Sequence, residues 1–253
     1  MAIAESTHWY DQAGKPAYTV IGANGKERPT TLRDARKLNL YPAVSTIMAV
    51  ADKPALTNWK VDQAVMSALT LPRLDGESLD DFMTRAKRDA KEQSMKAADR
   101  GTEIHADIES GFSGGGGEAY TNVRAWLDEN YPGETWIAED SFSHPTGFGG
   151  KIDLYSRAGI VVDFKTKDNL GDDASKLIYD EHGMQLSAYA HGLNIKNPRR
   201  VSIFVDRVSL KTLGHIWEAD TCDKHETMFL ALLKYWQTSK GYSPVQVETN
   251  ETA

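Results

Sequence analysis

Two aspartates and a lysine flank one turn signal in the second half of the chain, in the stretch Gly149-Gly-Lys-Ile-Asp-Leu-Tyr-Ser-Arg-Ala-Gly-Ile-Val-Val-Asp-Phe-Lys-Thr. If the turn is centred on Ala158, Asp153 and Asp163 face each other across a hairpin, where Cβ atoms are ~5 Å apart. At an effective dielectric constant of about 20, the two carboxylates repel by about 3 kcal/mol. Lys165 shares the face of Asp163, because alternate residues of a strand point the same way. Two carboxylates and an ammonium therefore converge, and the repulsion needs a compensating partner.

The strand that carries Asp163 is almost continuously apolar, since its other residues include Ile160, Val161, Val162 and Phe164. Such a run is typical of a strand covered on both faces. An isolated Asp-x-Lys motif is most often a salt bridge on an exposed strand. Charges within a covered strand instead favour a functional site.

Two further pairs of polar residues have a helical spacing. His105 and Glu109 are four residues apart, and so are Gln185 and Tyr189, so each pair lies on one helix face. Taken alone, the first pair is typical of a helix surface and the second of an ordinary amphipathic helix. Their order along the chain, around the two aspartates, is what suggests a common site.

The elements that position these residues are predicted from turn, cap and periodicity signals. Asn24-Gly25 predicts a hairpin turn after a strand at residues 18–22. Two helices are predicted between residues 45 and 70, the first capped by Ser45. A long helix from Ser78 to Glu109, broken near Gly101, follows.

The second half of the chain has a helix at residues 118–130 and then a βββαββα pattern. The strands are predicted at residues 136–142, 151–156, 159–166, 201–208 and 215–219, and the helices at 175–193 and 222–236. We therefore predict an α/β fold with a helical N-terminal part and a frayed C-terminal tail.

In chain order, the sequence has His105-x-x-x-Glu109, Gly150-x-x-Asp153, Asp163-x-Lys165-Thr166 and Gln185-x-x-x-Tyr189. This order, the spacing and the αβββαβ context resemble the RecB-type nucleases of the PD-(D/E)XK superfamily over residues 100–240. The segment Tyr41-Pro-Ala-Val-Ser-Thr-Ile, with Trp59-Lys60 downstream, resembles part of the mitochondrial genome maintenance exonucleases and their phage relatives.

The resemblance implies a PD-(D/E)XK nuclease core, which is α/β with a mixed central sheet flanked by helices, and an added helical N-terminal region. It implies one nuclease domain over residues 1–253. Within it we expect an N-terminal hairpin and helical region at 1–99, a catalytic core at 100–240 and a tail at 241–253.

By the same resemblance, a divalent cation is bound by His105, Asp153, Asp163 and the main-chain carbonyl of Phe164, and Lys165 is the catalytic lysine. A bound cation would resolve the repulsion between the two aspartates. Asp163 stands where many members of the superfamily have Glu, which keeps the carboxylate but shortens its reach.

The residue types fit this chemistry. Hard oxygen ligands suit Mg²⁺, and a histidine ligand makes Mn²⁺ a plausible substitute. Glu109 is expected to orient His105 or to reach a second cation, while Gln185 and Tyr189 position the lysine, the metal site or the substrate backbone. The chain lacks the cysteines of iron-sulfur members, so no such cluster is implied.

Nucleic acid would need a local basic surface, because the formal net charge of the chain is −7. The helix before His105 offers a candidate phosphate track, made by Arg85, Lys87, Arg88, Lys91, Lys96 and Arg100. Its alternative interpretation is a solvated helix face. Candidate residues for stacking on unpaired bases, which packing in the core would explain equally well, are Trp126, Trp136, Phe142 and Phe148.

The cysteine content and the lack of long apolar runs also indicate the cellular compartment of the protein. Cys222 is the single cysteine, so an intramolecular disulfide is excluded. No apolar run approaches the ~20 residues that cross a bilayer, and the first residues lack a secretory signal pattern. We expect a cytoplasmic protein without a membrane partner. The resemblance to phage exonucleases adds the cytoplasm of a phage-infected bacterium as one location.

These observations predict a metal-dependent exonuclease that hydrolyses phosphodiester bonds of linear DNA in phage-type recombination, replication or repair. Its expected partner is DNA with a free end, and a recombinase or single-strand-binding protein is left open. The alternatives are a non-catalytic DNA-end-binding module on the same fold, a structure-specific endonuclease, and an unrelated metallohydrolase of small phosphoesters.

Overall fold

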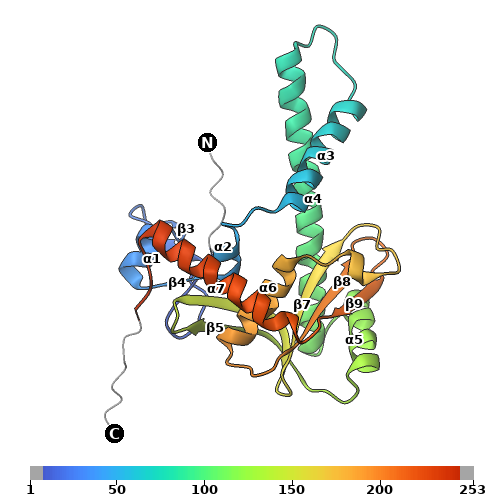
Figure 1. Ribbon diagram of the computed structural model, residues 1–253. Coiled ribbons are helices and arrows are strands. Elements are labelled where there is room, and N and C mark those ends of the chain that lie inside the picture. The colour runs from blue at the N-terminus through green and yellow to red at the C-terminus, as the bar shows by residue number, and fades with distance from the viewer. Residues whose placement is uncertain (1–7, 246–253) are drawn as a thin grey trace.

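The computed structural model describes residues 8–245, and its centre is a five-stranded mixed sheet in the order β5-β6-β7-β8-β9 (Figure 1). The strands span Trp136–His144 (β5), Phe148–Ser156 (β6), Ile160–Lys167 (β7), Arg199–Asp206 (β8) and Thr212–Ile216 (β9). β7 and β8 are parallel, and the other neighbours are antiparallel. The predicted mixed α/β architecture is confirmed. Residues 1–7 of the predicted N-terminal region and 246–253 of the predicted tail lie outside the described residues.

One face of the sheet is covered by α4 (Leu79–Phe112) and α5 (Glu118–Asn130). The buried residues of this layer include Ile104, Ile108, Val123, Leu127, Ile160, Val162 and Phe164. Since alternate residues of β7 face this layer, Asp163 and Lys165 face the opposite one.

The opposite face is covered by α6 (Asp180–Gly192) and α7 (Thr221–Lys240), which pack against each other. The larger buried side chains of this layer include Phe148, Ile152, Val161, Met184, Leu186, Phe229, Leu233 and Trp236. The charged face of β7 therefore points toward α6.

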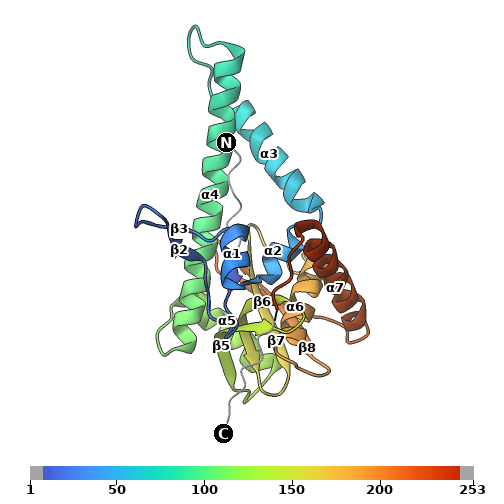
Figure 2. The same ribbon diagram turned by 90° about the vertical axis from the view of Figure 1, so that its left-hand side faces the viewer.

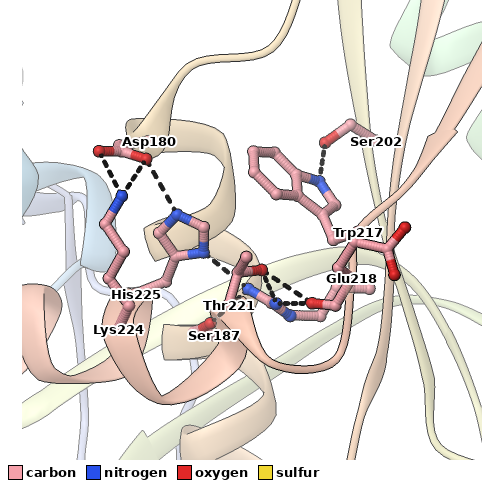
Figure 3. Close-up of polar contacts among 9 residues, drawn as sticks. Asp180, Ser187, Ser202, Trp217, Glu218, Thr221, Lys224 and His225 are labelled. Atoms are coloured by element: carbon pink, nitrogen blue, oxygen red, sulfur yellow. Dashed lines mark hydrogen bonds and ion pairs between the residues drawn. The ribbon is translucent and has the colours of Figure 1, made fainter. Parts of the chain in front are cut away.

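A buried hydrogen-bond network joins α6 and α7 to β8 (Figure 3). Arg200, on β8 and 1% exposed, donates to Ser187 Oγ at 3.0 Å and to His225 Nδ1 at 2.9 Å. Because a guanidinium only donates, His225 Nδ1 accepts, and its Nε2–H donates to Asp180 Oδ1 at 3.1 Å. Gly183 leaves room for the imidazole, since a Cβ there would lie 2.4 Å from the ring. The network fixes α6 on the sheet.

The described N-terminal residues form short strands and helices at one end of the sheet. The predicted hairpin is present as β2 (Thr19–Ile21) and β3 (Glu27–Pro29), and β1 (Trp9–Tyr10) pairs with β4 (Tyr41–Pro42). The helices are α1 (Leu32–Leu38), α2 (Val44–Met48) and α3 (Pro54–Thr70). The predicted cap at Ser45 is wrong: the N-cap of α2 is Ala43, two residues earlier, and it makes no side-chain hydrogen bond.

The helices α3 and α4 pack together as an arm that projects from the rest of the molecule (Figures 1 and 2). Their contact is narrow, with Ser67, Ala86 and Ala90 buried and Ser67 Oγ donating to Asp89 Oδ2 at 2.8 Å. Although α4 has 34 residues, neither it nor any other helix in the described part of the chain is apolar enough to cross a membrane.

Several boundaries differ from those predicted, among them that of the last strand, expected at residues 215–219 and found as β9 at Thr212–Ile216. α4 continues through Gly101, where a break was expected, because the bare Cα of this glycine faces Thr166: a Cβ would lie 2.9 Å from its Oγ1. The helix expected from Ser175 begins only at Asp180, after a separate 3-10 turn at Ala174–Lys176. β6 begins at Phe148 because the turn before it is tight, with Gly147 at a φ of 100°.

Candidate active site

The predicted juxtaposition of the two aspartates follows from the pairing of β6 and β7. Leu154 pairs with Val162 and Tyr155 with Val161, a register that places Asp153 opposite Asp163 one step further on. At this step the backbone pairing is replaced by a side-chain contact, because Phe164 N–H donates to Asp153 Oδ2 at 2.8 Å. The turn has its positive φ of 85° at Gly159.

Lys165 supplies the partner that the repulsion between the carboxylates requires. Its Nζ lies 2.5 Å from Asp163 Oδ2 and donates to Gln185 Oε1 at 2.9 Å. Gln185 Nε2 in turn donates to Tyr189 Oη at 2.8 Å, since the two residues share one face of α6. A chain of contacts therefore runs from the Asp163 carboxylate through the ammonium to the buried phenol of Tyr189.

His105 approaches the same carboxylates from the other layer. Its Nδ1 lies 3.9 Å from Asp153 Oδ2, and its ring meets the edge of Phe164 at a centroid distance of 6.1 Å. The close approach of α4 to β7 at Gly101 brings this imidazole to the sheet. The structure thus brings together His105, Asp153, Asp163, Lys165, Gln185 and Tyr189, which the sequence predicted as one site.

Glu109 lies at the edge of this group. It is exposed and lines a groove of about 560 Å³ together with His105 and Asp153. No hydrogen bond between Glu109 and His105 is present in the described part of the chain, so the expected orienting contact is not formed. The possible role of Glu109 toward a second cation stays a prediction.

Glu139 is a third carboxylate that the sequence analysis missed. The pairs Ala138 with Leu154 and Asp140 with Ile152 place it opposite Asp153. It has a positive φ of 57° and makes an ion pair with Lys151, and both line the groove of His105. A strand position opposite a candidate ligand was the available signal, but the register of β5 on β6 depends on a turn that the sequence does not mark clearly.

Burial sets the protonation of the site. Burial and the neighbouring Asp163 carboxylate raise the pKa of Asp153, while Lys165 partly opposes that rise. Burial also lowers the pKa of His105, which favours the neutral imidazole that can bind a metal ion. The pKa of Tyr189 is raised by burial and by the two aspartates, so the phenol stays protonated and can serve as a hydrogen-bond donor.

The donor set fits a hard divalent cation. Asp163 is 1% exposed, and its Oδ1 has no hydrogen-bond partner within residues 8–245. A buried carboxylate oxygen without a donor is costly, and a cation would satisfy it. In the same described residues, no three His, Cys, Asp or Glu side chains already stand together as a metal centre. In this structure the positive charge beside the Asp163 carboxylate is the ammonium of Lys165.

The basic residues predicted to bind DNA are spread along the arm and its base. Arg85 is bonded to Glu77 at 2.8 Å and to the Pro72 carbonyl, so it holds the turn of the arm. Arg100 pairs with Glu103 at 3.0 Å. The exposed lysines and arginine that remain are Lys87, Arg88, Lys91 and Lys96. Lys91, Ala98 and His105 follow at seven-residue intervals and share one helix face, so the face that carries Lys91 leads toward the site.

Other sequence features prove structural. Gly149 and Gly150 are closely packed by the chain itself: a Cβ at Gly150 would lie 3.0 Å from the ring of Phe142 and 3.1 Å from that of Tyr189. Phe142 and Phe148 are buried in the core, which is the alternative that the sequence analysis gave for the aromatic residues.

Comparisons with protein-family models and with curated proteins found no match. Among solved structures, the chain is similar to an alkaline exonuclease (LHK-Exo) from Laribacter hongkongensis, with 14% identity and a TM-score of 0.43 over 82% of this chain and 93% of that one. It is also similar to a protein named SSO0001, with 13% identity and a TM-score of 0.31 over 70% and 86% of the two chains. Both relationships are distant, and the proposal below depends on the site itself.

Proposed function

We propose that this chain is a divalent-metal-dependent deoxyribonuclease of the PD-(D/E)XK type that degrades linear DNA from an end. The observation that carries the proposal is the meeting of Asp153, Asp163 and Lys165 on adjacent strands, with one carboxylate oxygen left without a donor. An acidic pair beside an ammonium suits metal-assisted hydrolysis of a phosphodiester, because the carboxylates can hold a cation and the ammonium can stabilise negative charge on the phosphate.

Asp153, Asp163, His105 and the carbonyl of Phe164 would hold the cation, Mg²⁺ or Mn²⁺. When bound, such an ion neutralises charge on the phosphate and lowers the pKa of a coordinated water. The proposal requires no iron-sulfur cluster, since a single cysteine cannot hold one.

Lys165 has a separate task in this proposal. An ammonium has three N–H donors, and here two are directed to Asp163 and Gln185. The third meets no acceptor among residues 8–245 and can donate to a phosphate oxygen or the attacking water, where the charge stabilises the transition state. Gln185 and Tyr189 hold the ammonium in place, so they are positioning residues.

The wider setting belongs to the same proposal. We assign residues 1–253 to one nuclease domain, with residues 100–240 as its catalytic core. DNA with a free end in the cytoplasm is the proposed substrate, in recombination, replication or repair, with a recombinase or single-strand-binding protein as a candidate partner. The exposed face of α4 that carries Lys87 and Lys91 is the proposed phosphate track.

The test is incubation of end-labelled linear DNA and covalently closed circular DNA with Mg²⁺, Mn²⁺ or a chelator. Loss of linear DNA with a metal, and survival of circles, is expected. Cutting of circles would support the endonuclease alternative, and binding without cleavage would support the end-binding module. Cleavage of small phosphoesters with indifference to DNA would indicate an unrelated metallohydrolase.

A further inference from the structure

A second groove, distinct from the one beside His105, opens on the other side of Lys165. It has a volume of about 680 Å³ and lies between the start of α3, the end of β7 and the start of α6. Lys165 and Gln185 belong to its lining, so it is continuous with the candidate active site. None of the DNA-binding residues expected from the sequence lines it.

The lining of this groove is rich in cations. Lys53, Lys165, Lys167 and Arg207 face it, against the carboxylates of Asp168 and Glu181. Asp168 pairs with Arg207 at 2.6 Å. No ion pair to Lys53 or Lys167 is formed among the described residues, although the Glu181 carboxylate on the same groove is near enough to raise the pKa of Lys167 against the larger lowering by burial. In a chain with a net charge of −7, two lysines without a direct ion pair beside the reacting lysine form a local site for anions.

A buried imidazole also faces the groove. His182 is 4% exposed, and its Nδ1 has no hydrogen-bond partner in the described part of the chain. Its Nε2 lies 4.0 Å from Glu181. Burial, together with Lys165, Lys167 and Lys53, lowers its pKa to about 3, so the ring is neutral and can donate to or accept from a bound molecule.

Two aromatic rings complete the lining. Trp59 is half-buried on α3, and Tyr179 is 41% exposed immediately before α6, with the Lys167 ammonium 5.4 Å from its ring centroid. Aromatic rings alternating with lysines are typical of sites for unpaired nucleotides, because bases stack on the rings while phosphates meet the ammonium groups. Its volume lies within the ~300–1,000 Å³ of small-ligand sites and is of a size that suits a few unpaired nucleotides.

We propose that this groove binds a short single-stranded segment of the nucleic acid next to the scissile bond, with bases on Trp59 and Tyr179 and phosphates at Lys53 and Lys167. The assignment rests on the proposed nuclease function for its substrate class. It adds that the substrate is unpaired on one side of the site.

Binding is measured by fluorescence anisotropy with labelled single-stranded oligothymidylate and with a blunt-ended hairpin duplex, both in EDTA so that no cleavage occurs. The variant Tyr179→Ala should raise the Kd for the single strand by at least ~5-fold, and the double variant that adds Trp59→Ala by at least ~30-fold, because each stacked base contributes about 1–3 kcal/mol. The double variant Lys53→Ala, Lys167→Ala should make the slope of the logarithm of the association constant against the logarithm of the salt concentration less steep by about 1.4, because two phosphate contacts are lost. Affinity for the duplex should change less than ~2-fold.

The matched control is Lys234→Ala with Tyr235→Ala on the exposed side of α7, which should bind like the wild type. Circular dichroism verifies folding, and Tyr179→Ala alone keeps the test valid if loss of Trp59 disturbs α3. If the groove variants bind the single strand as the wild type does, or if the wild type does not bind it, the proposal that the groove holds single-stranded nucleic acid is wrong. If the variants lose binding while the wild type cleaves nothing with Mg²⁺ or Mn²⁺, the groove stands and the nuclease proposal fails.

Discussion

At the scale of single residues, the Asp163 carboxylate is the group on which the proposed site depends most. It is buried, and Lys165 and the candidate metal share it. We expect Asp163→Asn to lower the rate of cleavage of linear DNA by at least ~100-fold, because the amide keeps the shape but loses the charge that holds a cation. The measurement is release of end label with Mg²⁺, and the control is Asp128→Asn on the exposed side of α5. Full activity of Asp163→Asn would remove this carboxylate from the site.

Lys165 should separate turnover from metal binding. Its ammonium lies 2.5 Å from Asp163 Oδ2, where it competes with a cation for the carboxylate. Lys165→Met should therefore lower the rate by at least ~100-fold and leave the affinity for Mn²⁺ equal or higher, as measured by calorimetric titration. A loss of Mn²⁺ affinity as large as that of Asp163→Asn would show that Lys165 supports the metal site instead of the reaction.

Gln185 and Tyr189 should have graded effects. Gln185→Ala removes the direct acceptor of the Lys165 ammonium, whereas Tyr189→Phe removes only the hydroxyl behind that amide. We expect kcat to fall by at least ~10-fold in Gln185→Ala and by less in Tyr189→Phe, since a hydrogen bond to a charged group contributes about 1.5–3 kcal/mol and one between neutral groups about 1 kcal/mol. KM should change little in either, because the contacts proposed for the bases and phosphates are made by other residues, namely Trp59, Tyr179, Lys53 and Lys167. A larger effect of Tyr189→Phe would contradict this order.

The sequence predicted these residues because their positions follow from two periods. Asp153, Asp163 and Lys165 are placed by the strand period of two around one turn, and Gln185 with Tyr189 by the helical spacing of four. Glu139 and His182 were not predicted as site residues. Their positions depend on how β5 pairs with β6 and how α6 lies against β7, which are tertiary properties without a local signal.

At the scale of elements, the hairpin, the helices α2 to α7 and the five strands of the central sheet were predicted in the right order, mainly from turns and periodicity, whereas α1, β1 and β4 were not predicted. The arm of α3 and α4 was not predicted either, since the pattern predicts helices but not that they leave the sheet. The glycines illustrate the same limit: Gly101 and Gly183 indicate helix breaks by propensity, yet each allows a helix to approach a neighbour closely.

Gly183 tests whether the attachment of α6 to α7 positions the site. A Cβ at this glycine would lie 2.4 Å from the ring of His225, which Arg200 and Asp180 hold in place. Gly183→Ala should therefore cost about 1–3 kcal/mol of stability and reduce cleavage, because α6 carries Gln185. Thermal unfolding and initial rates measure the two effects. Wild-type stability in Gly183→Ala would show that the ring can move without cost.

At the scale of the whole molecule, burial of imidazoles should make stability depend on pH. Burial lowers the pKa of six of the seven histidines of the chain, namely His8, His105, His144, His182, His215 and His225. Below a pH of about 6.5, the unfolded chain binds protons that the folded chain does not, so the free energy of unfolding falls as the pH falls. The raised pKa values of Asp153, to about 8, and of Glu139 act in the opposite sense over the same interval, so the net loss of stability is smaller than the histidines alone would give.

We therefore expect the free energy of unfolding, from urea titrations in EDTA, to decrease by about 1–3 kcal/mol between pH 7 and pH 5. His225→Gln provides the internal check, because an amide can accept from Arg200 and donate to Asp180 without titrating. Its loss of stability over the same interval should be smaller than that of the wild type. If the wild type were equally stable or more stable at pH 5, proton uptake by Asp153 and Glu139 would outweigh that of the histidines. An equal loss in both proteins would remove His225 from the titrating set.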